Sequence, residues 1–459
     1  MDEIKKELFY RPKNGYDAVG TDELLAMEEY CRGYMRYLND ARTEREAVRE
    51  AVALAEEAGF REMTEDFTDI RPGEKVYCVN RGKSLLLAVG GRRPLSEGAV
   101  IAAAHIDSPR LDLKQNPLYE DSELAYLRTH YYGGIKKYQW TAIPLELHGV
   151  VSLRSGETVD VVIGRAEDDP QFVVTDLLPH LAADQMGKTA SKLIEGEKLC
   201  LLAGSVPYAG EGSDRVKLAV MSLLNDRYGI TEEDFISAEL EVVPAFPVRE
   251  LGLDRSMIGG YGQDDRVCAY AELAAVLETE APERTAVCVL ADKEEIGSEG
   301  VTGMRSAAFE RFMERLIGGS CPLQACFSRS LCVSADVTAA LDPLYPEVCE
   351  KQNAAKLNYG VGLCKFTGSR GKAGASDASA ELVGYIRRLC GDNGVLWQMC
   401  ELGKVDQGGG GTVAMFMAQR DIDTIDAGVP VLSMHSPFET TAKLDCYMTY
   451  KCVKAAYNA

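Results

Sequence analysis

The chain has 459 residues, of which 46% are apolar and 26% charged, a composition typical of a folded globular protein that is long enough for two domains. Its formal net charge of −21 argues against nucleic acid and anionic membrane surfaces as partners, because both are themselves negatively charged. Fourteen cysteines without a CxxC pair, no apolar run of membrane-spanning length and no signal-like N-terminus favour a cytoplasmic location.

The first part of the chain is predicted to hold two helices and then two short strands. Leu24, Tyr30 and other apolar residues keep helical spacing after position 21. Thr43 and Glu46 have the spacing of a capping box, which predicts that a second helix begins there and continues to position 58. Strands are expected over 75–79 and 84–89.

Four later segments are continuous apolar runs of strand length, and helical patterns lie between them at 267–277 and 378–389. Such runs are typical of strands buried on both faces of a sheet. The sequence therefore predicts an α/β fold, a three-layer α/β/α sandwich with a parallel or mixed sheet. The runs are AVIAAA (99–104), AVCVLA (286–291), LCVS (331–334) and VPVLS (429–433).

Between residues 113 and 247 the pattern changes to alternating, β-like segments, including 145–153, 158–163 and 239–243. We expect this stretch to form an inserted β-rich domain. The remaining segments, 1–112 and 248–459, would then form one discontinuous catalytic domain.

Each of the four apolar runs leads into residues that can bind a metal ion. In α/β sheets, ligand sites form beyond the carboxyl ends of the strands, so these residues are expected to meet. Taken singly, each has an ordinary alternative: a hydrogen-bonded histidine, a solvated turn or a helix cap. Together they match the nitrogen and oxygen ligands of a zinc site. They are His105 and Asp107, then Asp292, Glu294 and Glu295, then Asp336, and finally His435.

Asp264 and Asp265 follow a glycine-rich turn and precede a helix. They could cap that helix. Alternatively, one carboxylate could lie between two cations and offset their mutual repulsion, as in sites with paired metals.

Several motifs, taken in order, resemble those of the aspartyl-aminopeptidase family of dinuclear zinc metallopeptidases, in its bacterial subgroup. The resemblance extends over nearly the whole chain. The motifs are RPKNGY (11–16), HIDSPR (105–110), LPHLA (178–182), YGQDDR (261–266), DKEEIGSEG (292–300), SADV (334–337) and SMHS (433–436).

This resemblance implies a hydrolase that removes the N-terminal residue of peptides with a free N-terminus, using two zinc ions, with cobalt or manganese as alternatives. It implies that His105 and Asp336 hold one metal ion and that Glu295 and His435 hold the other. Asp264 would bridge them through a carboxylate next to a cis peptide bond with Asp265. Metal coordination suits this reaction because it makes water a nucleophile at neutral pH.

The resemblance also implies roles for three further residues. Glu294 would be the general base, and Asp107 would accept the second ring N–H of His105 and so orient it. The inserted domain would mediate dimerisation and bring His180 into a neighbouring active site. The expected assembly is a homo-oligomer, a tetrahedral dodecamer built from dimers.

The sequence does not decide which N-terminal residue the enzyme prefers: the preference is either for acidic residues or for neutral residues or a broad range. The segment around Lys372 and the glycine run 408–411 lie where the family lines its pocket, but Lys372 and the stretch YGGIKKYQW (132–140) lie in segments that differ from the eukaryotic branch. Two other functions remain: a metal-dependent amidohydrolase or deacylase acting on another amide, and a non-catalytic assembly protein that has kept the fold.

Overall fold

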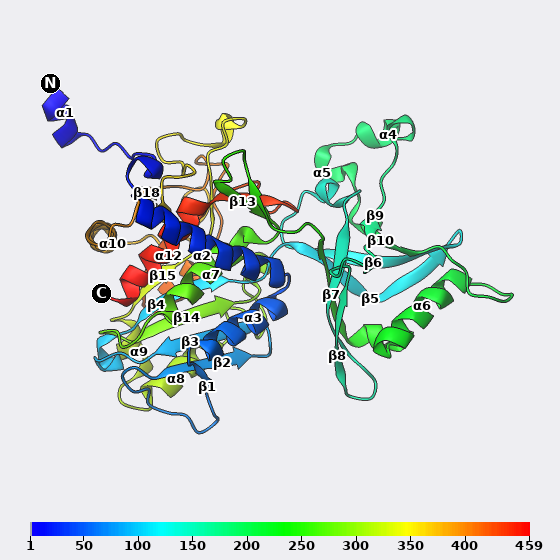
Figure 1. The fold of residues 1–459 in the computed structure, drawn as a ribbon, viewed down its shortest axis with the longest axis horizontal. Helices are drawn as coiled ribbons and strands as arrows, with labels where there is room; N and C mark the ends of the chain where they lie inside the picture. The colour runs from blue at the N-terminus through cyan, green and yellow to red at the C-terminus, as the bar shows by residue number, and fades with distance from the viewer. Residues whose placement is uncertain (1) are drawn as a thin grey trace.

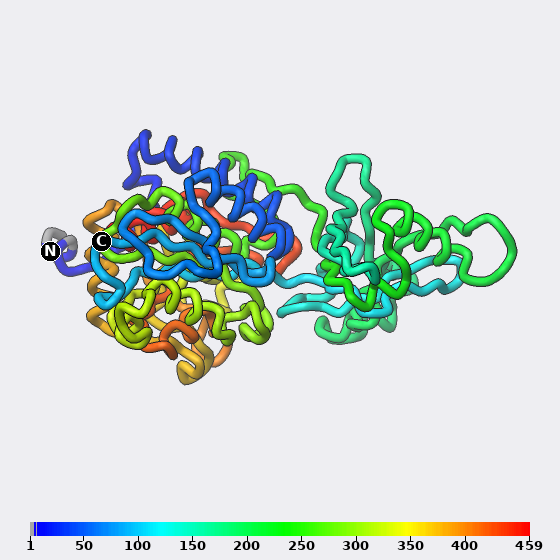
Figure 2. The backbone as a smooth tube through the Cα atoms, turned by 90° about the horizontal axis from the view of Figure 1, so that it is seen from below, coloured from blue at the N-terminus to red at the C-terminus, as the bar shows by residue number. Residues whose placement is uncertain are grey.

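The computed structural model describes residues 2–459 and has two lobes joined side by side (Figures 1 and 2). The larger lobe carries both ends of the described chain. The smaller lobe is built from the chain between β5 (Arg110–Asp121) and β11 (Ala238–Pro244). Within residues 2–459, no helix is both long and apolar enough to cross a membrane.

A nine-stranded mixed sheet forms the centre of the larger lobe. Its middle strands β14, β4, β15 and β19 run parallel, whereas β3 and β17 are antiparallel to their inner neighbours. In spatial order the strands are β1 (Arg61–Glu62), β2 (Lys75–Asn80), β3 (Ser84–Val89), β14 (Ala286–Ala291), β4 (Val100–His105), β15 (Leu331–Ser334), β19 (Asp423–Gly428), β17 (Val361–Cys364) and β18 (Trp397–Met399).

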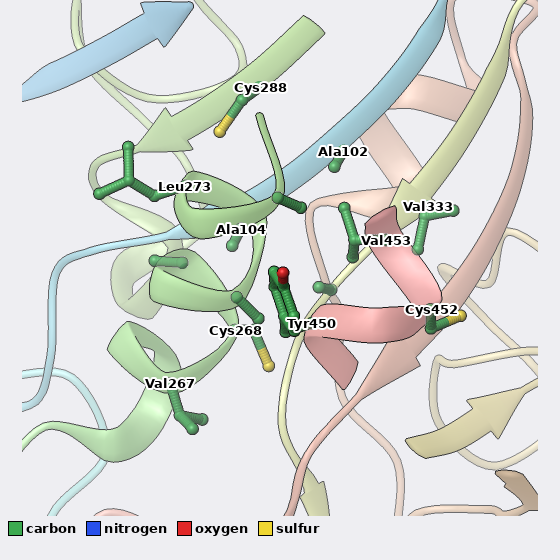
Figure 3. Packing of buried hydrophobic residues seen from close by; sticks show 14 of the residues in the cluster. Ala102, Ala104, Val267, Cys268, Leu273, Cys288, Val333, Tyr450, Cys452 and Val453 are labelled. Carbon is green, nitrogen blue, oxygen red and sulfur yellow. The ribbon is translucent and has the colours of Figure 1, made fainter. Parts of the chain in front are cut away.

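Helices cover both faces of this sheet, which confirms the predicted three-layer fold. Alternate residues of β4 enter opposite layers: Ala102 and Ala104 pack with Leu273 and Val453 (Figure 3), whereas Ile101 and Ala103 join the other cluster. One layer holds α2 (Thr21–Asp40), α3 (Glu44–Glu57), α7 (Gln263–Leu277), α10 (Ala380–Asp392) and α12 (Lys443–Tyr457). The other holds α8 (Ala308–Ile317), α9 (Leu323–Phe327) and α11 (Ala414–Ala418), while α1 (Asp2–Leu8) extends away from the lobe (Figure 1).

The N-terminal predictions are confirmed. The Thr43 side chain accepts the Glu46 N–H and the Glu46 carboxylate accepts the Thr43 N–H, so a complete capping box begins α3. Both short strands form as β2 and β3.

The prediction for 429–433 as a strand of the central sheet is wrong. Residues Pro430–Leu432 form β20, which belongs to a smaller five-stranded sheet, and the place in the central sheet is taken by β19. Three polar residues, Asp423, Thr424 and Asp426, interrupt the apolar pattern of β19 and hide it in the sequence. The smaller sheet also contains β12 (Arg249–Leu251), β13 (Met257–Gly260), β21 (Glu439–Ala442) and β16 (Thr338–Ala339).

The smaller lobe is a seven-stranded sheet with one long helix, α6 (Arg215–Tyr228), against it. The β pattern predicted between 113 and 247 is therefore present, while the domain boundaries themselves remain a prediction. The other elements are β8 (Thr158–Ile163), β7 (Leu145–Ser152), β6 (Leu124–Tyr132), β10 (Cys200–Gly204), β9 (Val173–Val174), α4 (Ala183–Met186) and α5 (Ala190–Leu193).

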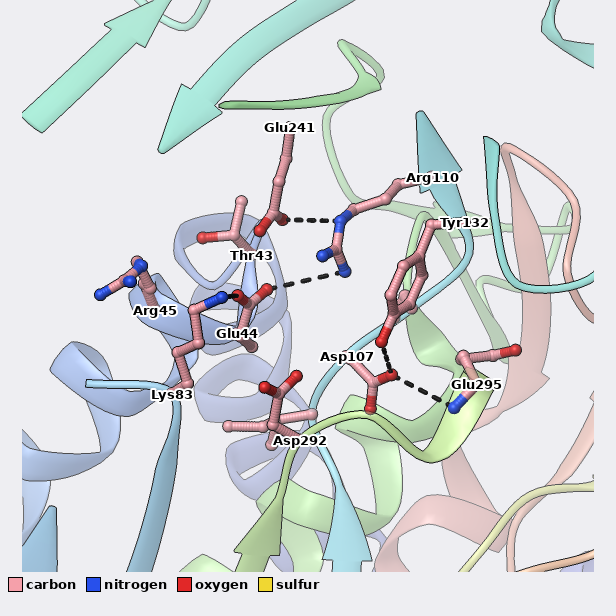
Figure 4. Close-up of polar contacts among 12 residues, drawn as sticks. Thr43, Glu44, Arg45, Lys83, Asp107, Arg110, Tyr132, Glu241, Asp292 and Glu295 are labelled. Atoms are coloured by element: carbon pink, nitrogen blue, oxygen red, sulfur yellow. Dashed lines mark hydrogen bonds and ion pairs between the residues drawn. The ribbon is translucent and has the colours of Figure 1, made fainter. Parts of the chain in front are cut away.

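Buried charges join the two lobes. Arg110 of β5 lies with Nη1 3.6 Å from Glu44 Oε2 in α3 and with Nε 3.1 Å from Glu241 Oε2 in β11 (Figure 4). Lys83 Nζ is 3.4 Å from the other oxygen of Glu44. Because buried charges are costly unless paired, this network resists any change in how the lobes meet.

Candidate metal centre

The first potential ligand cluster lies at the carboxyl edge of the central sheet. His105 ends β4, Asp336 follows β15, and Asp264 lies at the start of α7. His105 Nε2 is 3.2 Å from Asp264 Oδ1 and 3.9 Å from Asp336 Oδ1. The three ligand atoms lie within 4.8 Å of one another. The peptide bond between Asp264 and Asp265 is cis, as the resemblance implies.

A second cluster shares Asp264 with the first. His435 Nε2 is 3.0 Å from Asp264 Oδ2 and 3.5 Å from Glu295 Oε1. These three residues again place one ligand atom each within 4.8 Å. The two oxygens of Asp264 therefore face different histidines, one in each cluster.

The other ring nitrogen of each histidine contacts a backbone carbonyl. His105 Nδ1 lies 2.9 Å from the Asp107 carbonyl oxygen, and His435 Nδ1 lies 2.8 Å from the Gly134 carbonyl oxygen. A carbonyl only accepts, so each Nδ1 carries a proton, and Nε2 is the ring atom that faces the cluster and can bind a cation once its own proton is lost. The carboxylate of Asp107 is slightly farther from His105 Nδ1, at 3.3 Å.

The Asp107 carboxylate mainly holds the turn that carries both glutamates (Figure 4). Its Oδ1 accepts the backbone N–H of Glu294 at 3.1 Å, and its Oδ2 accepts that of Glu295 at 3.2 Å. Oδ2 also accepts the Tyr132 hydroxyl at 2.7 Å. The turn, a 3-10 helix over Glu294–Ile296, is flanked by left-handed Lys293 and Gly297.

Sequence reasoning missed Glu439, a buried residue of β21. Its carboxylate accepts the backbone N–H of Asp264 at 3.1 Å and that of His435 at 2.7 Å, so it ties the two segments together. Its position four residues after His435 carries no recognisable signal, because the pairing depends on the smaller sheet. In the sequence, Tyr132 and Gly134 stand out only as part of a stretch that differs from the eukaryotic branch, which does not predict their contacts with the site.

Negative charge is crowded here. Burial, reinforced by Asp264, raises the pKa of Glu295 well above its ordinary value, and burial raises that of Glu294 to about 7. Burial opposes protonation of His435, but Asp264 and Glu295 outweigh it and raise the pKa of the ring to about 10. Without cations, Glu295 therefore retains a proton that it would lose in water.

The donor set fits divalent zinc. Each cluster offers one imidazole and two carboxylates, which are ligands that zinc accepts, and three protein ligands are the number typical of a catalytic zinc site. Oε1 of Glu295 is buried and has no hydrogen-bond partner among the residues the structure describes. A bound cation would satisfy this buried oxygen.

Both clusters lie in a cleft of about 560 Å³. The glycine run 408–411 and Lys372, which the resemblance placed near the pocket, line it together with Arg370 and Asp426. Asp292, also considered as a ligand, points elsewhere and accepts the Thr302 hydroxyl at 2.5 Å. His180 lies on an exposed turn of the smaller lobe and is not among the described residues that line this cleft.

Comparison with known proteins gives consistent results. The aminopeptidase I zinc metalloprotease (M18) family matches residues 37–457. A probable M18 family aminopeptidase 1 from Clostridium acetobutylicum is 46% identical over 464 aligned residues, covering 99% of this chain and 100% of that protein. The crystal structure of an M18 aminopeptidase from Thermotoga maritima has a TM-score of 0.93 at 44% identity, covering 98% of this chain and 100% of that one.

A more distant likeness shows the fold alone: the mApe1 dodecamer of S. cerevisiae has a TM-score of 0.76 at 19% identity, covering 94% of this chain and 96% of that one. The close relatives and the family match favour an aminopeptidase over the deacylase and the non-catalytic protein. The chain thus belongs to the M18 family of zinc aminopeptidases.

Proposed function

We propose that this aminopeptidase works with two zinc ions that share the carboxylate of Asp264. The observation that carries the proposal is the opposed orientation of its two oxygens, Oδ1 towards His105 and Oδ2 towards His435. His105 and Asp336 would complete one site, and Glu295 and His435 the other. When bound, the ions would supply Lewis-acid activation of water and of the scissile carbonyl.

The chain's own residues would then move the proton. The Glu294 carboxylate lines the cleft, and its Oε2 lies 4.0 Å from His105 Nε2, at the edge of the clusters. From there it can take a proton from the attacking water and deliver it to the leaving amine. Asp107 fixes the backbone of the turn that carries both glutamates, so that Glu294 can act as the base while Glu295 binds a metal ion.

Replacing Glu294 with Gln tests this assignment. We expect kcat to fall by about 10²- to 10⁴-fold because the general base is lost. Zinc content should be unchanged, since Glu294 is outside both ligand clusters. Glu299→Gln, an exposed change in the same loop, is the matched control. Unchanged activity of Glu294→Gln would remove Glu294 from the mechanism.

The proposed metal site also favours a free N-terminus. A neutral α-amine has a nitrogen lone pair that can bind a zinc ion in the cleft, whereas the nitrogen of an acetylated terminus is an amide and is a much poorer ligand. Peptides that differ only in N-acetylation should therefore differ strongly in kcat/KM. Equal rates would instead indicate a general amidohydrolase.

We further propose a neutral or broad preference for the N-terminal side chain. Lys372 Nζ is already 3.3 Å from Asp377 and lies over the Phe366 ring, and Asp426 adds negative charge to the cleft wall. An acidic side chain would therefore gain little there. Aminoacyl fluorogenic substrates compared on zinc-loaded protein, with cobalt and manganese as alternatives, test this preference. A clear preference for aspartyl or glutamyl substrates would contradict it.

We propose a homo-oligomer in which His180 acts in a neighbouring subunit, with the tetrahedral dodecamer as the expected form. Exposed apolar side chains lie close to His180 in the sequence, including Leu178 at 50%, Leu181 at 70% and Met186 at 73% exposure, and such residues favour a protein contact. The S. cerevisiae mApe1 dodecamer supports the assembly. Light scattering of Leu181→Asp should show smaller particles, and His180→Gln should lower activity without changing size.

We also propose a cytoplasmic location. All fourteen cysteines are free thiols in the structure. These include two pairs whose sulfur atoms are in contact, Cys364 with Cys400 and Cys390 with Cys452. Free thiols in this number are typical of a reducing compartment.

A further inference from the structure

Two thiols face each other beside the cleft. Strands β17 and β18 run parallel with Leu363 opposite Met399, which places the next residues, Cys364 and Cys400, opposite each other. Their sulfur atoms are 3.1 Å apart. We propose that Cys364 and Cys400 form a reversible disulfide when a small peroxide enters the cleft, and that this disulfide lowers the activity of the enzyme.

The backbone geometry suits this bond. Neighbouring strands lie about 4.8 Å apart, inside the range of about 4.4–6.8 Å between the Cα atoms of a disulfide. The sulfurs need to approach by only about 1 Å to reach the bond length of about 2.05 Å. Side-chain rotation can supply most of this movement, so the central sheet can stay intact.

Access distinguishes this pair from the other close pair in the described chain. Cys364 lines the cleft and is 7% exposed, whereas Cys400 lies behind it at 3%. Cys390 and Cys452 also have sulfurs 3.9 Å apart, but they are packed between α10 and α12 in the core and do not line the cleft. A peroxide, which is little larger than water, can therefore reach Cys364 first.

The reaction balances with hydrogen peroxide as the two-electron oxidant. The Cys364 thiolate attacks one peroxide oxygen, the O–O bond breaks, and a sulfenic acid and water form once a proton is taken up. The Cys400 sulfur then attacks Cys364 Sγ, the S–O bond breaks, and a second water leaves. Both sulfurs are oxidised and the peroxide is reduced. The contact with Cys400 and burial raise the pKa of the Cys364 thiol, so the reaction should be faster at higher pH.

The expected effect on activity rests on the proposed function. Cys364 borders the cleft together with Thr338 and Asp426, and Thr338 follows the proposed ligand Asp336 by two residues. When the disulfide forms, the Cys364 sulfur moves towards Cys400 and away from the cleft wall that it forms with Thr338 and Asp426. Displacements of about 1 Å in a positioning wall can change rates substantially, and we expect kcat/KM to fall about tenfold.

The test uses full-length, zinc-loaded protein treated with hydrogen peroxide, alkylated without reduction, digested and analysed by mass spectrometry. The expected result is a peptide pair joined by Cys364 and Cys400, with Cys390 and Cys452 alkylated. Recovery of Cys364 and Cys400 both alkylated, or of Cys364 joined to a different cysteine, would overturn the proposal. This measurement needs no activity, so it can succeed even if the proposed function fails.

Activity before and after peroxide is then compared within each variant. Wild type and the core control Cys390→Ser should lose about tenfold in kcat/KM and recover with dithiothreitol. Cys364→Ser and, as a second variant, Cys400→Ala should form no disulfide, and neither should show a loss that dithiothreitol reverses. A disulfide that forms without any change in kcat/KM would refute the effect on activity.

Discussion

The Tyr132 hydroxyl, at the end of a strand of the smaller lobe, donates a 2.7 Å hydrogen bond to Asp107 Oδ2 in the larger lobe. The same oxygen accepts the backbone N–H of Glu295. The Arg110 guanidinium lies over the Tyr132 ring, 3.9 Å from its centre, and holds it in place. The smaller lobe therefore braces the turn that carries Glu294 and Glu295 in the same chain, apart from any part it has in assembly.

Replacing Tyr132 with Phe should lower kcat/KM about tenfold, equivalent to about 1.4 kcal/mol. The buried Asp107 loses a donor, and the turn that it holds is less well fixed. Tyr131→Phe, at a neighbouring side chain with 43% exposure, is the matched control. Steady-state kinetics with thermal unfolding checks the prediction. Unchanged kinetics in Tyr132→Phe would mean that the turn does not need this contact.

The shared carboxylate predicts unequal effects of ligand substitutions on zinc content. Asp264→Asn should lose zinc from both sites, because it removes a ligand from each cluster, whereas Asp336→Asn and Glu295→Gln should each lose zinc mainly from one. Elemental analysis after dialysis checks this, with Glu299→Gln as the unaffected control. Equal zinc loss in all three ligand variants would contradict two sites joined through Asp264.

Much of the larger lobe could be predicted because its strands are buried on both faces. The runs AVCVLA and LCVS form β14 and β15 with the predicted boundaries, because an unbroken apolar run of that length is typical of a buried strand. The strand β19 was missed because Asp426 turns its side chain to the cleft, where three hydroxyls donate to it. Local pattern cannot show that a polar residue in a strand faces a site.

The proposed ligands could be found from the sequence because they follow strands and because their motifs resemble a known family. The residues that orient these ligands could not be found from the sequence. Glu439 and the Gly134 carbonyl act through contacts between segments far apart in the chain, and a backbone carbonyl has no residue type to recognise. For the same reason, the sequence predicts only the contact of Asp107 with the His105 ring and not its hydrogen bonds to the backbone of the glutamate turn.

Glu295→Gln should also stabilise the metal-free protein while it weakens metal binding. In the absence of cations, the Glu295 carboxyl is buried near Asp264 and takes up a proton that it would lose in water, which costs free energy at neutral pH; a neutral amide of the same shape avoids this cost. We expect a gain of about 1 kcal/mol in the free energy of unfolding in chelator. Added zinc should stabilise wild type by about 2.7 kcal/mol for each site at 100 times its dissociation constant, and the variant by less.

Urea unfolding in chelator, and then in zinc, measures both parts of this prediction. Exposed Glu299→Gln should follow wild type in each condition. A metal-free Glu295→Gln protein that unfolds at lower urea than wild type would show that the site is not electrostatically strained without its ions.

The last prediction concerns pH and the contact between the lobes. His148 of β7 is fully buried between Glu46 of α3 and Glu146 of β7, each 2.8 Å from a ring nitrogen. Burial opposes protonation, but the hydrogen bonds that the protonated ring donates to Glu146 and Glu46 outweigh it and raise the pKa of His148 above its ordinary 6.5. Burial opposes ionisation of Glu46, yet the bond from His148 outweighs it and lowers its pKa below 4.5.

The signs follow from these directions. A raised histidine pKa contributes stability that is complete below pH 6.5 and is lost as pH rises through the pKa of the folded protein. A lowered Glu46 pKa contributes stability that is present above pH 4.5 and is lost as pH falls through the folded value. The contribution of this cluster should therefore be greatest between these two values and decline as the solution becomes alkaline.

His148→Gln should cost about 3 kcal/mol at pH 6, because it leaves buried carboxylates without their cation. The difference in unfolding free energy between wild type and His148→Gln should shrink steadily as the pH is raised above 6.5, as the wild-type ring loses its proton. His130→Gln, at an exposed position of the same lobe, should show no such trend. A difference that stays constant with pH would mean that His148 is neutral in the folded protein, and that the lobes are joined there by hydrogen bonds alone.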